Sequence, residues 1–493
     1  MRLSIVRKFP KYLVFAACLW LIGASESKAA SLLATGTLTG SKSGVNADLS
    51  GLTGNLENGL PKNILGGLGS GLTWAGGNTF LAIPDRGPNA TPYNSQVDDT
   101  VSFISRFHTI SMELTPNAPG SAQPFSLIPT LAKTTLLYSS TPLTYGTGSN
   151  VSLGSGAPSV NTPSKFYFTG RSDNYDPSKN SGNPNDARFD PEGIRLSNDG
   201  TSVFVSDEYG PYIYQFNRST GERIRTFTLP DKFYVKNLSS VGSTEIKNNT
   251  SGRTANKGVE ALAITPDGKT LVAMVQASLI QDANAGGKSA KVLRMVTIDI
   301  ATGATTHEYA YNLTTGSGVS DIVALNDHEF LVDERDGKGL GDGSSAAIKQ
   351  VFKIDISNAS DVSNLTGAQA VNKAVTKSAQ PFLDIVNILN SAPNNIPKNQ
   401  IPSKIEGLAI GQDVIVNGVV NHTLWVANDN DFVPETAGPN RFYVFGFTDA
   451  DLGNSTFAPQ NVSTVPEPTA SAELLMLGLG AFLLKRQSRA IKK

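Results

Sequence analysis

The sequence predicts an all-β protein built from a repeated unit. Along the chain a phrase recurs in which an acidic residue begins a short apolar segment, a turn follows, and a second apolar segment ends in further acids. Short runs of β-branched and aromatic residues are bounded by Gly, Asn, Asp and Pro, as in antiparallel strands joined by turns. No long helical pattern is present between the termini. These features predict a single β-propeller of about six four-stranded blades with long loops.

The fullest copy of the repeat is RFDPEGIRLSNDGTSVFVSDEYG. Glu192 begins its first apolar segment, Asn198-Asp199-Gly200 forms the turn, and the second segment leads into Asp207-Glu208. An Asp-Gly pair between two apolar runs is typical of a β-hairpin. This copy therefore predicts two paired strands with acids at the start of the first and at the end of the second.

Later copies repeat the acids at long intervals. Glu260 follows Glu192 by 68 residues, Asp321 follows Glu260 by 61, and Glu406 follows Asp321 by 85. These intervals exceed the ~40 to 50 residues of common propeller repeats and leave room for four strands with generous loops. A radial repeat places one strand position of every blade at the same end of a central channel, so the recurring acids are expected to converge.

The N-terminal segment has the pattern of a signal peptide. Basic residues precede an apolar run from Tyr12 to Gly23, and Ser27-Lys28-Ala29 supplies the small residues of a cleavage site. We therefore predict that residues 1–29 are a signal peptide, removed by signal peptidase during export. Cys18, the only cysteine, lies in this run, so the mature chain is expected to hold no thiol for a disulfide, a nucleophile or a zinc site.

The C-terminal segment, residues 465–493, contains Pro466-Glu467-Pro468, an apolar stretch from Leu474 to Leu484 and a basic end. It resembles the bacterial PEP-CTERM sorting signal, which an exosortase recognises and removes. Glu473 departs from that pattern, and the clean apolar run is shorter than the ~20 residues of a stable span. We predict a transient membrane anchor only; the alternative is an amphipathic helix packed on the domain.

The charge balance excludes one class of partner. The chain has 41 basic and 42 acidic residues; the segments 1–29 and 466–493 hold 10 and 3 of these, so the remainder has 31 and 39 and a net charge of −8. A mildly acidic exported domain is a poor candidate for binding nucleic acid and a reasonable one for binding cations.

The region between the termini resembles a known family. The strings DRGPN at Asp85-Arg86, TGRSDN at Arg171, RFDPEGIRLSNDG at Glu192 and VSDEYGPYIYQFN at Asp207-Glu208, with GVEALAITPDG and KIEGLAI, are similar to the phytase-like family of secreted bacterial proteins, described as "esterase-like activity of phytase". The resemblance implies a propeller domain over residues 30–464. Because the family is related to β-propeller phytases, it also implies calcium-assisted phosphoester hydrolysis.

Oxygen ligands are the only abundant metal ligands in this chain. Its four histidines stand in unrelated segments without the spacing of a zinc site. Calcium takes about six to eight carboxylate, carbonyl and water oxygens, so convergent acids of successive blades can build a calcium site. The candidate metal ligands are Glu192, Asp207, Glu260, Asp321, Asp333, Glu334, Glu406 and Asp429, and the candidate catalytic residues are Glu192, Asp207 and Glu208. The alternative for any single acid is a carboxylate that accepts backbone N–H bonds at a strand end, or a solvated charge in a loop.

Arginines stand beside several of these acids. Hydrolysis of a phosphomonoester with metal ions requires guanidinium groups that grip the remaining phosphate oxygens in bidentate fashion. The candidate substrate-binding residues are Arg86, Arg171, Arg188 and Arg335. A structural salt bridge is the alternative for each of them.

These observations predict an exported, calcium-dependent phosphoester hydrolase that acts on a phosphorylated small molecule. The alternative is a non-catalytic matrix propeller that binds an extracellular polymer or a partner and uses calcium as a structural clamp. We expect a monomer in the periplasm, at the cell surface or in the extracellular matrix of a Gram-negative-type bacterium. Several cations close to the acids would favour the enzyme, since a calcium clamp does not need them.

Overall fold

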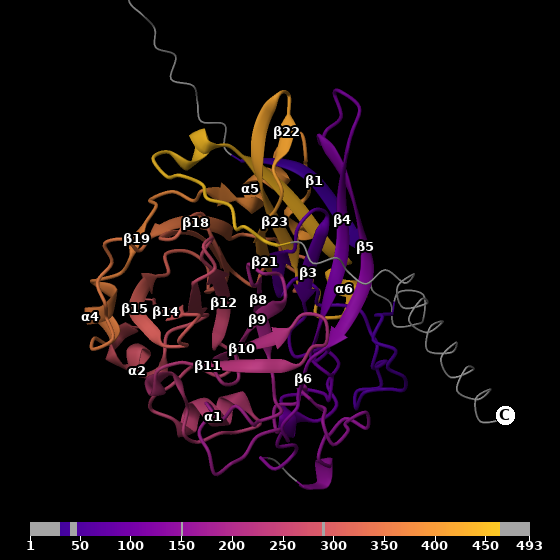
Figure 1. The fold of residues 1–493 in the computed structure, drawn as a ribbon, viewed down its shortest axis with the longest axis vertical. Coiled ribbons are helices and arrows are strands. Elements are labelled where there is room, and N and C mark those ends of the chain that lie inside the picture. The colour runs from indigo at the N-terminus through magenta and orange to yellow at the C-terminus, as the bar shows by residue number, and fades with distance from the viewer. Residues whose placement is uncertain (1–29, 40–46, 149–150, 288–290, 464–493) are drawn as a thin grey trace, which may run out of the picture.

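Five antiparallel sheets surround a common centre, as the blades of a β-propeller (Figure 1). The computed structural model describes residues 30–39, 47–148, 151–287 and 291–463. The predicted propeller is confirmed, but the described residues form five blades, and the prediction of about six was too high. The predicted signal peptide and sorting segment lie outside the described residues.

Each blade follows the chain from its innermost to its outermost strand. The first blade contains β2 (Gly71–Trp74), β3 (Thr79–Ile83), β4 (Arg106–Pro116) and β5 (Phe125–Leu136). The second contains β8 (Pro191–Leu196), β9 (Ser202–Asp207), β10 (Tyr212–Asn217) and β11 (Arg223–Thr228). The third contains β12 (Val259–Ile264), β13 (Thr270–Val275), β14 (Val292–Asp299) and β15 (Thr305–Asn312). The fourth contains β16 (Gly318–Ala324), β17 (Glu329–Arg335), β18 (Lys349–Asp355), β19 (Thr376–Lys377) and β20 (Leu383–Asp384).

The fifth blade joins the two ends of the described chain. Its strands are β21 (Ile405–Ile410), β23 (Val419–Asn428), β24 (Asn440–Phe447) and β1 (Ser31–Leu38), and β22 (Val414–Val416) pairs with β23. The first strand of the chain is thus the outermost strand of the last blade, antiparallel to β24. This pairing closes the ring and covers an edge that would otherwise be open.

In the part of the chain that the structure describes, residues 115–160 form no blade of their own. Their first part belongs to the long hairpin of β4 and β5, which extends away from the ring at the top of Figure 1. The chain then forms only β6 (Tyr138–Ser139), which pairs with β7 (Phe166–Tyr167) in a small two-stranded sheet. The Ser-, Thr-, Gly- and Pro-rich stretch therefore lengthens the connection between the first two blades instead of adding a sixth.

Apolar side chains fill the interfaces between neighbouring blades. Five buried clusters each combine residues of two adjacent blades, and every residue of β12 is buried. A blade has neighbours on both faces, so its inner strands need apolar residues on both sides, which explains their continuous apolar runs. The innermost strands contact one another in the cyclic order β2, β8, β12, β16 and β21.

A buried ion pair blocks the axis inside this ring. Arg195 of β8 donates from Nη2 to Asp321 Oδ1 of β16 at 2.7 Å and from Nη1 to the carbonyl oxygen of Leu72 in β2 at 2.7 Å. Asp321 Oδ2 accepts the backbone N–H of Leu408 in β21 at 2.8 Å. One arginine and one aspartate thereby connect four of the five innermost strands.

The C-terminal part of the described chain covers one end of the axis. Gln460 Nε2 donates to the carbonyl oxygen of Leu196, and the backbone N–H of Ala458 donates to the carbonyl oxygen of Leu325. A cavity of about 50 Å³ remains between this segment and the inner strands, with Arg195 in its lining. In Figure 1 the yellow segment runs across the front of the ring toward its centre. Access to the axis is therefore from the opposite end.

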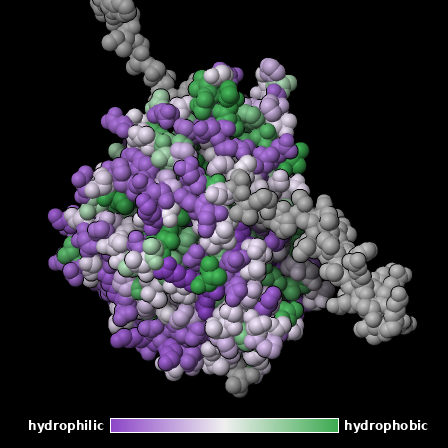
Figure 2. All heavy atoms as spheres, viewed as in Figure 1, coloured by the Kyte–Doolittle hydropathy of each residue, from purple (hydrophilic) through white to green (hydrophobic). Residues whose placement is uncertain are grey.

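Among the described residues, α-helices occur only as short pieces within loops. They are α1 (Gly242–Asn248), α2 (Ile280–Asp282), α4 (Gly367–Val371), α5 (Ile385–Asn390) and α6 (Pro434–Ala437). In the described part of the chain, none of them has the length and apolarity needed to cross a membrane. The face shown in Figure 2 is largely hydrophilic, with an apolar group at its top near the β22–β23 hairpin, where Ile415, Val419 and Val420 are exposed.

Candidate metal centre at the propeller axis

Three glutamates occupy the same position on three innermost strands. Glu192, Glu260 and Glu406 are the second residues of β8, β12 and β21, and all three are buried. The pairing register of each strand shifts at or directly after its glutamate, so a β-bulge accompanies each of them. Bulges re-aim side chains near a sheet end. Burial, together with neighbouring carboxylates that include Glu260 and Glu406, raises the pKa of Glu192 well above its usual range.

Two further acids join Glu192. Asp190 precedes β8, Glu208 follows β9, and one carboxylate oxygen of each of the three residues lies within 4.8 Å of the others. Asp190 is fully buried, and Glu208 is 1% exposed. We call Asp190, Glu192, Glu208, Glu260 and Glu406 the central acidic cluster. Burial raises the pKa of Glu208 to about 7, with Asp190 adding to the shift.

Two oxygens of the cluster, Glu208 Oε1 and Glu260 Oε2, are inaccessible to solvent and accept no hydrogen bond from the rest of the protein. The two carboxyl groups lie close enough to each other to share a proton. A buried carboxylate oxygen without a donor is costly, by about 1–3 kcal/mol and more when the group is charged. Such oxygens fit a cation that accepts carboxylate ligands, and the all-oxygen set suits calcium.

Arginines approach the cluster from two sides. Arg86 Nη1 donates to Asp190 Oδ2 at 2.6 Å and also contacts Asn256 Oδ1. Arg335 Nη2 contacts Glu406 Oε1 and lies 4.0 Å from Glu260 Oε1, while its buried Nε has no partner. The arginine side chains are 16% and 13% exposed, so solvent reaches the cluster on this side.

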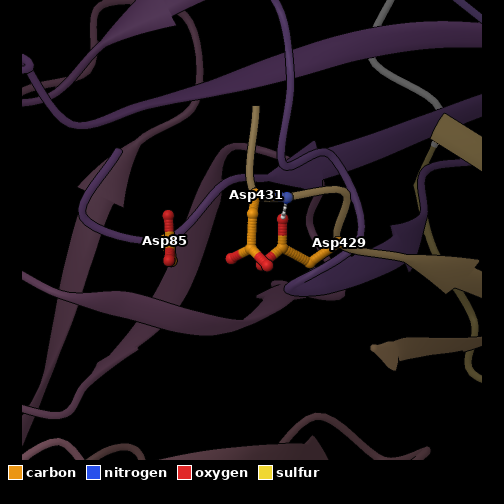
Figure 3. Close-up of side chains that lie close together, drawn as sticks. All are labelled: Asp85, Asp429 and Asp431. Atoms are coloured by element: carbon orange, nitrogen blue, oxygen red, sulfur yellow. Dashed lines mark hydrogen bonds between the residues drawn. The ribbon is translucent and has the colours of Figure 1, made fainter. Parts of the chain in front are cut away.

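A second group of acids lies beside the first. Asp85 follows β3, while Asp429 and Asp431 follow β23, and their carboxylates come within 4.8 Å of one another (Figure 3). Lys404 Nζ lies 2.7 Å from Asp429 Oδ2 and 2.6 Å from Asp431 Oδ1. Burial, with Asp429 adding to the effect, raises the pKa of Asp85 well above its usual range.

A pocket that we call the arginine pocket adjoins the central acidic cluster at Arg86. It has a volume of about 360 Å³ and is lined by Arg86, Arg188, Arg253, Tyr209 and several Ser and Thr residues around α1. The Arg188 guanidinium lies over the rings of Tyr175 and Tyr209, and its buried Nη2 has no partner. The nearest ion-paired acid is Glu245, whose Oε2 is 3.8 Å from Arg188 Nη1. Arg188 thus has one buried guanidinium nitrogen without a partner in the wall of this pocket, which Asp98 and Glu245 also line.

Several predicted ligands lie away from the cluster. Asp321 binds Arg195 at the axis. In the β16 bulge Ser320 takes the position that glutamate has in β8 and β21, and Asp321 is the next residue along the strand. Asp207 accepts the backbone N–H groups of Asp190 and Gly210, so it holds the loop that carries Asp190. Both aspartates are predicted metal ligands and Asp207 is also a predicted catalytic residue, but in the structure their carboxylates have these partners and belong to neither acid group of the described residues.

Three other predicted residues bind local partners away from the cluster. Asp333 accepts the Ser320 hydroxyl at 2.8 Å and is on β17, the second strand of its blade. Glu334 accepts hydrogen bonds from Tyr311, Thr315 and Lys377. Arg171 binds Asp173 through two nitrogens and donates to the carbonyl oxygens of Leu153 and Gly154. Asp333 keeps one buried oxygen without a partner, but neither it nor Glu334 belongs to the two acid groups of the described residues.

Sequence reasoning missed Asp190, Lys404 and Asp431. Asp190 and Lys404 each precede a recurring glutamate by two residues, as DPE and KIE. Alternate residues of a strand point to the same face, so this spacing is a signal that could have found them.

The fold and this cluster define a propeller protein with a buried, charged site at one end of its axis. The chain belongs to the phytase-like family, described as "Esterase-like activity of phytase", which matches residues 63–432. A relative from Arthroderma benhamiae, described as an uncharacterized secreted protein, is 31% identical over 263 residues, or 50% of this chain and 48% of the relative. The chain thus spans about half the length of that relative.

Solved structures resemble the chain only weakly. A gluconolactonase from Xanthomonas campestris shows 11% identity and a TM-score of 0.28, with 86% of this chain and 99% of that chain covered. Hydrazine synthase from Kuenenia stuttgartiensis shows 15% identity and a TM-score of 0.25, with 50% and 55% covered. Similarity of this strength says nothing about ligand or activity.

Proposed function

We propose that the chain is an exported, calcium-dependent phosphoester hydrolase whose metal binds at the central acidic cluster. The observation that carries the proposal is the pair of buried, unpartnered oxygens, Glu208 Oε1 and Glu260 Oε2, beside Asp190 and Glu192. Their carboxylates are poorly stabilised without a cation, because burial and mutual repulsion raise the pKa of Glu208 and Glu260.

Asp190, Glu192, Glu208 and Glu260 would hold the metal. When bound, calcium supplies positive charge that polarises a phosphoryl oxygen and lowers the pKa of a coordinated water. Asp207 positions Asp190 through the backbone N–H that it accepts at 2.8 Å. Asp190 and Glu406 are paired with Arg86 and Arg335, so they contribute less charge to the metal than Glu192, Glu208 and Glu260.

The cationic side chains support a phosphate substrate. Arg86 and Arg335 stand directly beside the acids, and Arg335 Nε has no partner. In the adjoining arginine pocket Arg188 presents a second free guanidinium nitrogen. Guanidinium groups bind phosphate oxygens through charge-assisted hydrogen bonds, which are about twice as strong as neutral ones.

The test is a phosphatase assay of the purified protein on a panel of phosphomonoesters, with calcium and with a chelator. We expect hydrolysis in calcium that chelation abolishes, and loss of this activity in Glu260→Gln. Glu308→Gln is the matched control, because Glu308 is also a buried glutamate but pairs with Arg294 and Lys232 outside the cluster. A folded, calcium-loaded protein without metal-dependent turnover would contradict the proposal.

The same cluster also supports a second function, a non-catalytic matrix propeller that binds an extracellular polymer or partner. The observation that favours it is that Arg86 and Arg335 already pair with Asp190 and Glu406, as in a structural network. Calcium binding without turnover, together with retention of an acidic or phosphorylated polymer on the immobilised protein, would support this function instead.

Export to the periplasm, cell surface or matrix is part of the proposal. The secreted relative supports export, and the two terminal signals that would direct it lie outside the described residues. Mass spectrometry of the protein recovered from surface and culture fractions tests this, with cleavage after residue 29 and loss of residues 465–493 as the expected result.

A further inference from the structure

Asp85, Asp429 and Asp431, which we call the Asp85 group, offer a set of carboxylates comparable to that of the central acidic cluster. The two sets differ in whether a cation of the protein already lies among the acids. In each, three carboxylate oxygens lie within 4.8 Å of one another. Asp85 and Asp429 are buried, 5% and 2% exposed, and Asp431 is partly exposed. Figure 3 shows the carboxylates of Asp429 and Asp431 together, with Asp431 N–H donating to Asp429 Oδ1 at 2.7 Å.

Lys404 enters the Asp85 group from the start of β21. Its ammonium lies 2.7 Å from Asp429 and 2.6 Å from Asp431, so it bridges the two carboxylates. Lys404 stands two residues before Glu406, so the strand that carries one acid of the central cluster also delivers this cation. Burial alone would lower the pKa of Lys404, but the surrounding acids outweigh it and raise the pKa well above its usual range.

We propose that the Lys404 ammonium is a tethered cation that occupies the Asp85 group, so that the protein binds divalent metal at the central acidic cluster and nowhere else among these acids. In the central cluster, by contrast, two buried oxygens have no donor. Lys404 therefore determines how many metal ions this end of the propeller takes. The inference goes beyond the proposed function and holds for a catalyst or a binding propeller.

The physical reason is the cost of displacing the lysine. A metal ion that bound Asp429 and Asp431 would have to move the ammonium away from both carboxylates while lying close to it. Like charges a few ångströms apart in a poorly solvated site repel strongly. A side chain attached to the same chain also competes at a high effective concentration.

Two variants test the proposal by calcium titration calorimetry. Asp431→Asn removes one acid of the Asp85 group at a partly exposed position, where folding should be retained. We expect calcium stoichiometry to stay as in the unmodified protein and the Kd to change by less than about twofold. Loss of a calcium ion from the stoichiometry of this variant would overturn the proposal.

Lys404→Met removes the ammonium and keeps the apolar stem. We expect this variant to bind one divalent cation more than the unmodified protein, and to lose that additional ion when Asp431→Asn is added. Lys257→Met is the control, because Lys257 contacts the neutral Gln276 and lies near Glu208 rather than in the Asp85 group, so its removal should leave the stoichiometry unchanged. An unchanged stoichiometry in Lys404→Met would overturn the proposal. If the unmodified protein binds no calcium and Lys404→Met binds one ion, only the central calcium site would be refuted.

Discussion

At the scale of single residues, a β-bulge determines which acids meet. In β8 and β21 the bulge contains Glu-Gly, so the glutamate takes the position that points toward the cluster. In β16 the same bulge contains Ser320-Asp321, and the aspartate instead meets Arg195. A shift of one residue along a strand reverses the face of its side chains, which is enough to convert a candidate ligand into part of the axial ion pair.

Arg188→Lys tests the contribution of the arginine pocket. Lysine keeps the charge but loses the planar fork and the free Nη2, so we expect KM for a phosphomonoester to rise about tenfold while the calcium requirement stays the same. Arg171→Lys is the matched control, because Arg171 already has partners for its guanidinium. That variant should lower thermal stability and leave KM unchanged; equal effects of the two substitutions on KM would contradict the assignment.

His108 should make the free energy of unfolding depend on pH, and substitution of this residue isolates its contribution. Burial lowers the pKa of His108 to about 4, against the opposing effect of Asp48. Between about pH 4 and 6.5 the unfolded chain therefore binds more protons than the folded chain, so this residue's contribution to stability is complete above pH 6.5 and is lost as the pH falls toward 4. The contribution amounts to roughly 3 kcal/mol at most.

Denaturant unfolding at pH 7.5 and 4.5 measures this effect. We expect His108→Gln to lose less stability than the unmodified protein between the two pH values. The comparison is needed because buried acids with raised pKa values, such as Asp333, change stability in the opposite direction over the same range. Parallel pH profiles of the two proteins would show that His108 does not titrate in this way.

At the scale of strands, the axial ion pair holds the ring together. Arg195 and Asp321 connect β2, β8, β16 and β21 through hydrogen bonds of 2.7–2.8 Å. Both side chains are buried, with Arg195 4% exposed and Asp321 fully buried. The pair also closes the axis, so the acidic cluster is a site with one entrance rather than part of an open channel.

Arg195→Met should lower the free energy of unfolding by about 3–5 kcal/mol, because it leaves Asp321 as a buried charge without a cation. Adding Asp321→Asn removes that charge, and the double variant should recover part of the loss. Equilibrium denaturation of the single and double variants measures both effects. A double variant no more stable than Arg195→Met would mean that the loss comes from packing rather than from charge.

At the scale of the whole molecule, the ring is closed by its first and last described strands. The outer strand β1 pairs with β24 along most of its length, and the residues after β24 return to cover one end of the axis. Glu192, Glu260 and Glu406 belong to three different blades, and they can converge only if this ring is closed. Metal binding at the axis and global stability should therefore be coupled.

Calcium should raise the melting temperature of the protein in a concentration-dependent way. A ligand that binds only the folded state stabilises it by about 2.7 kcal/mol at a hundredfold excess over Kd. Calorimetry with calcium and with a chelator measures the shift, and Glu260→Gln should reduce it. The same melting temperature under both conditions would count against a calcium site.

The sequence by itself determined the class of fold and the identity of three central acids. The Glu192, Glu260 and Glu406 repeats could be predicted because propeller symmetry relates equal strand positions to equal places around an axis. The family was likewise recognisable, since its motifs are contiguous strings around Asp85, Arg171 and Glu192.

Only the tertiary structure decided the partners of these residues. The number of blades, five rather than about six, depended on how the strands pair into sheets, which the composition of the chain does not determine. The role of Asp321 depended on a one-residue bulge, and that of Lys404 on two acids from another strand end. Charges interact through space, over a few ångströms, and the chain brings these groups together only after it has closed into a ring.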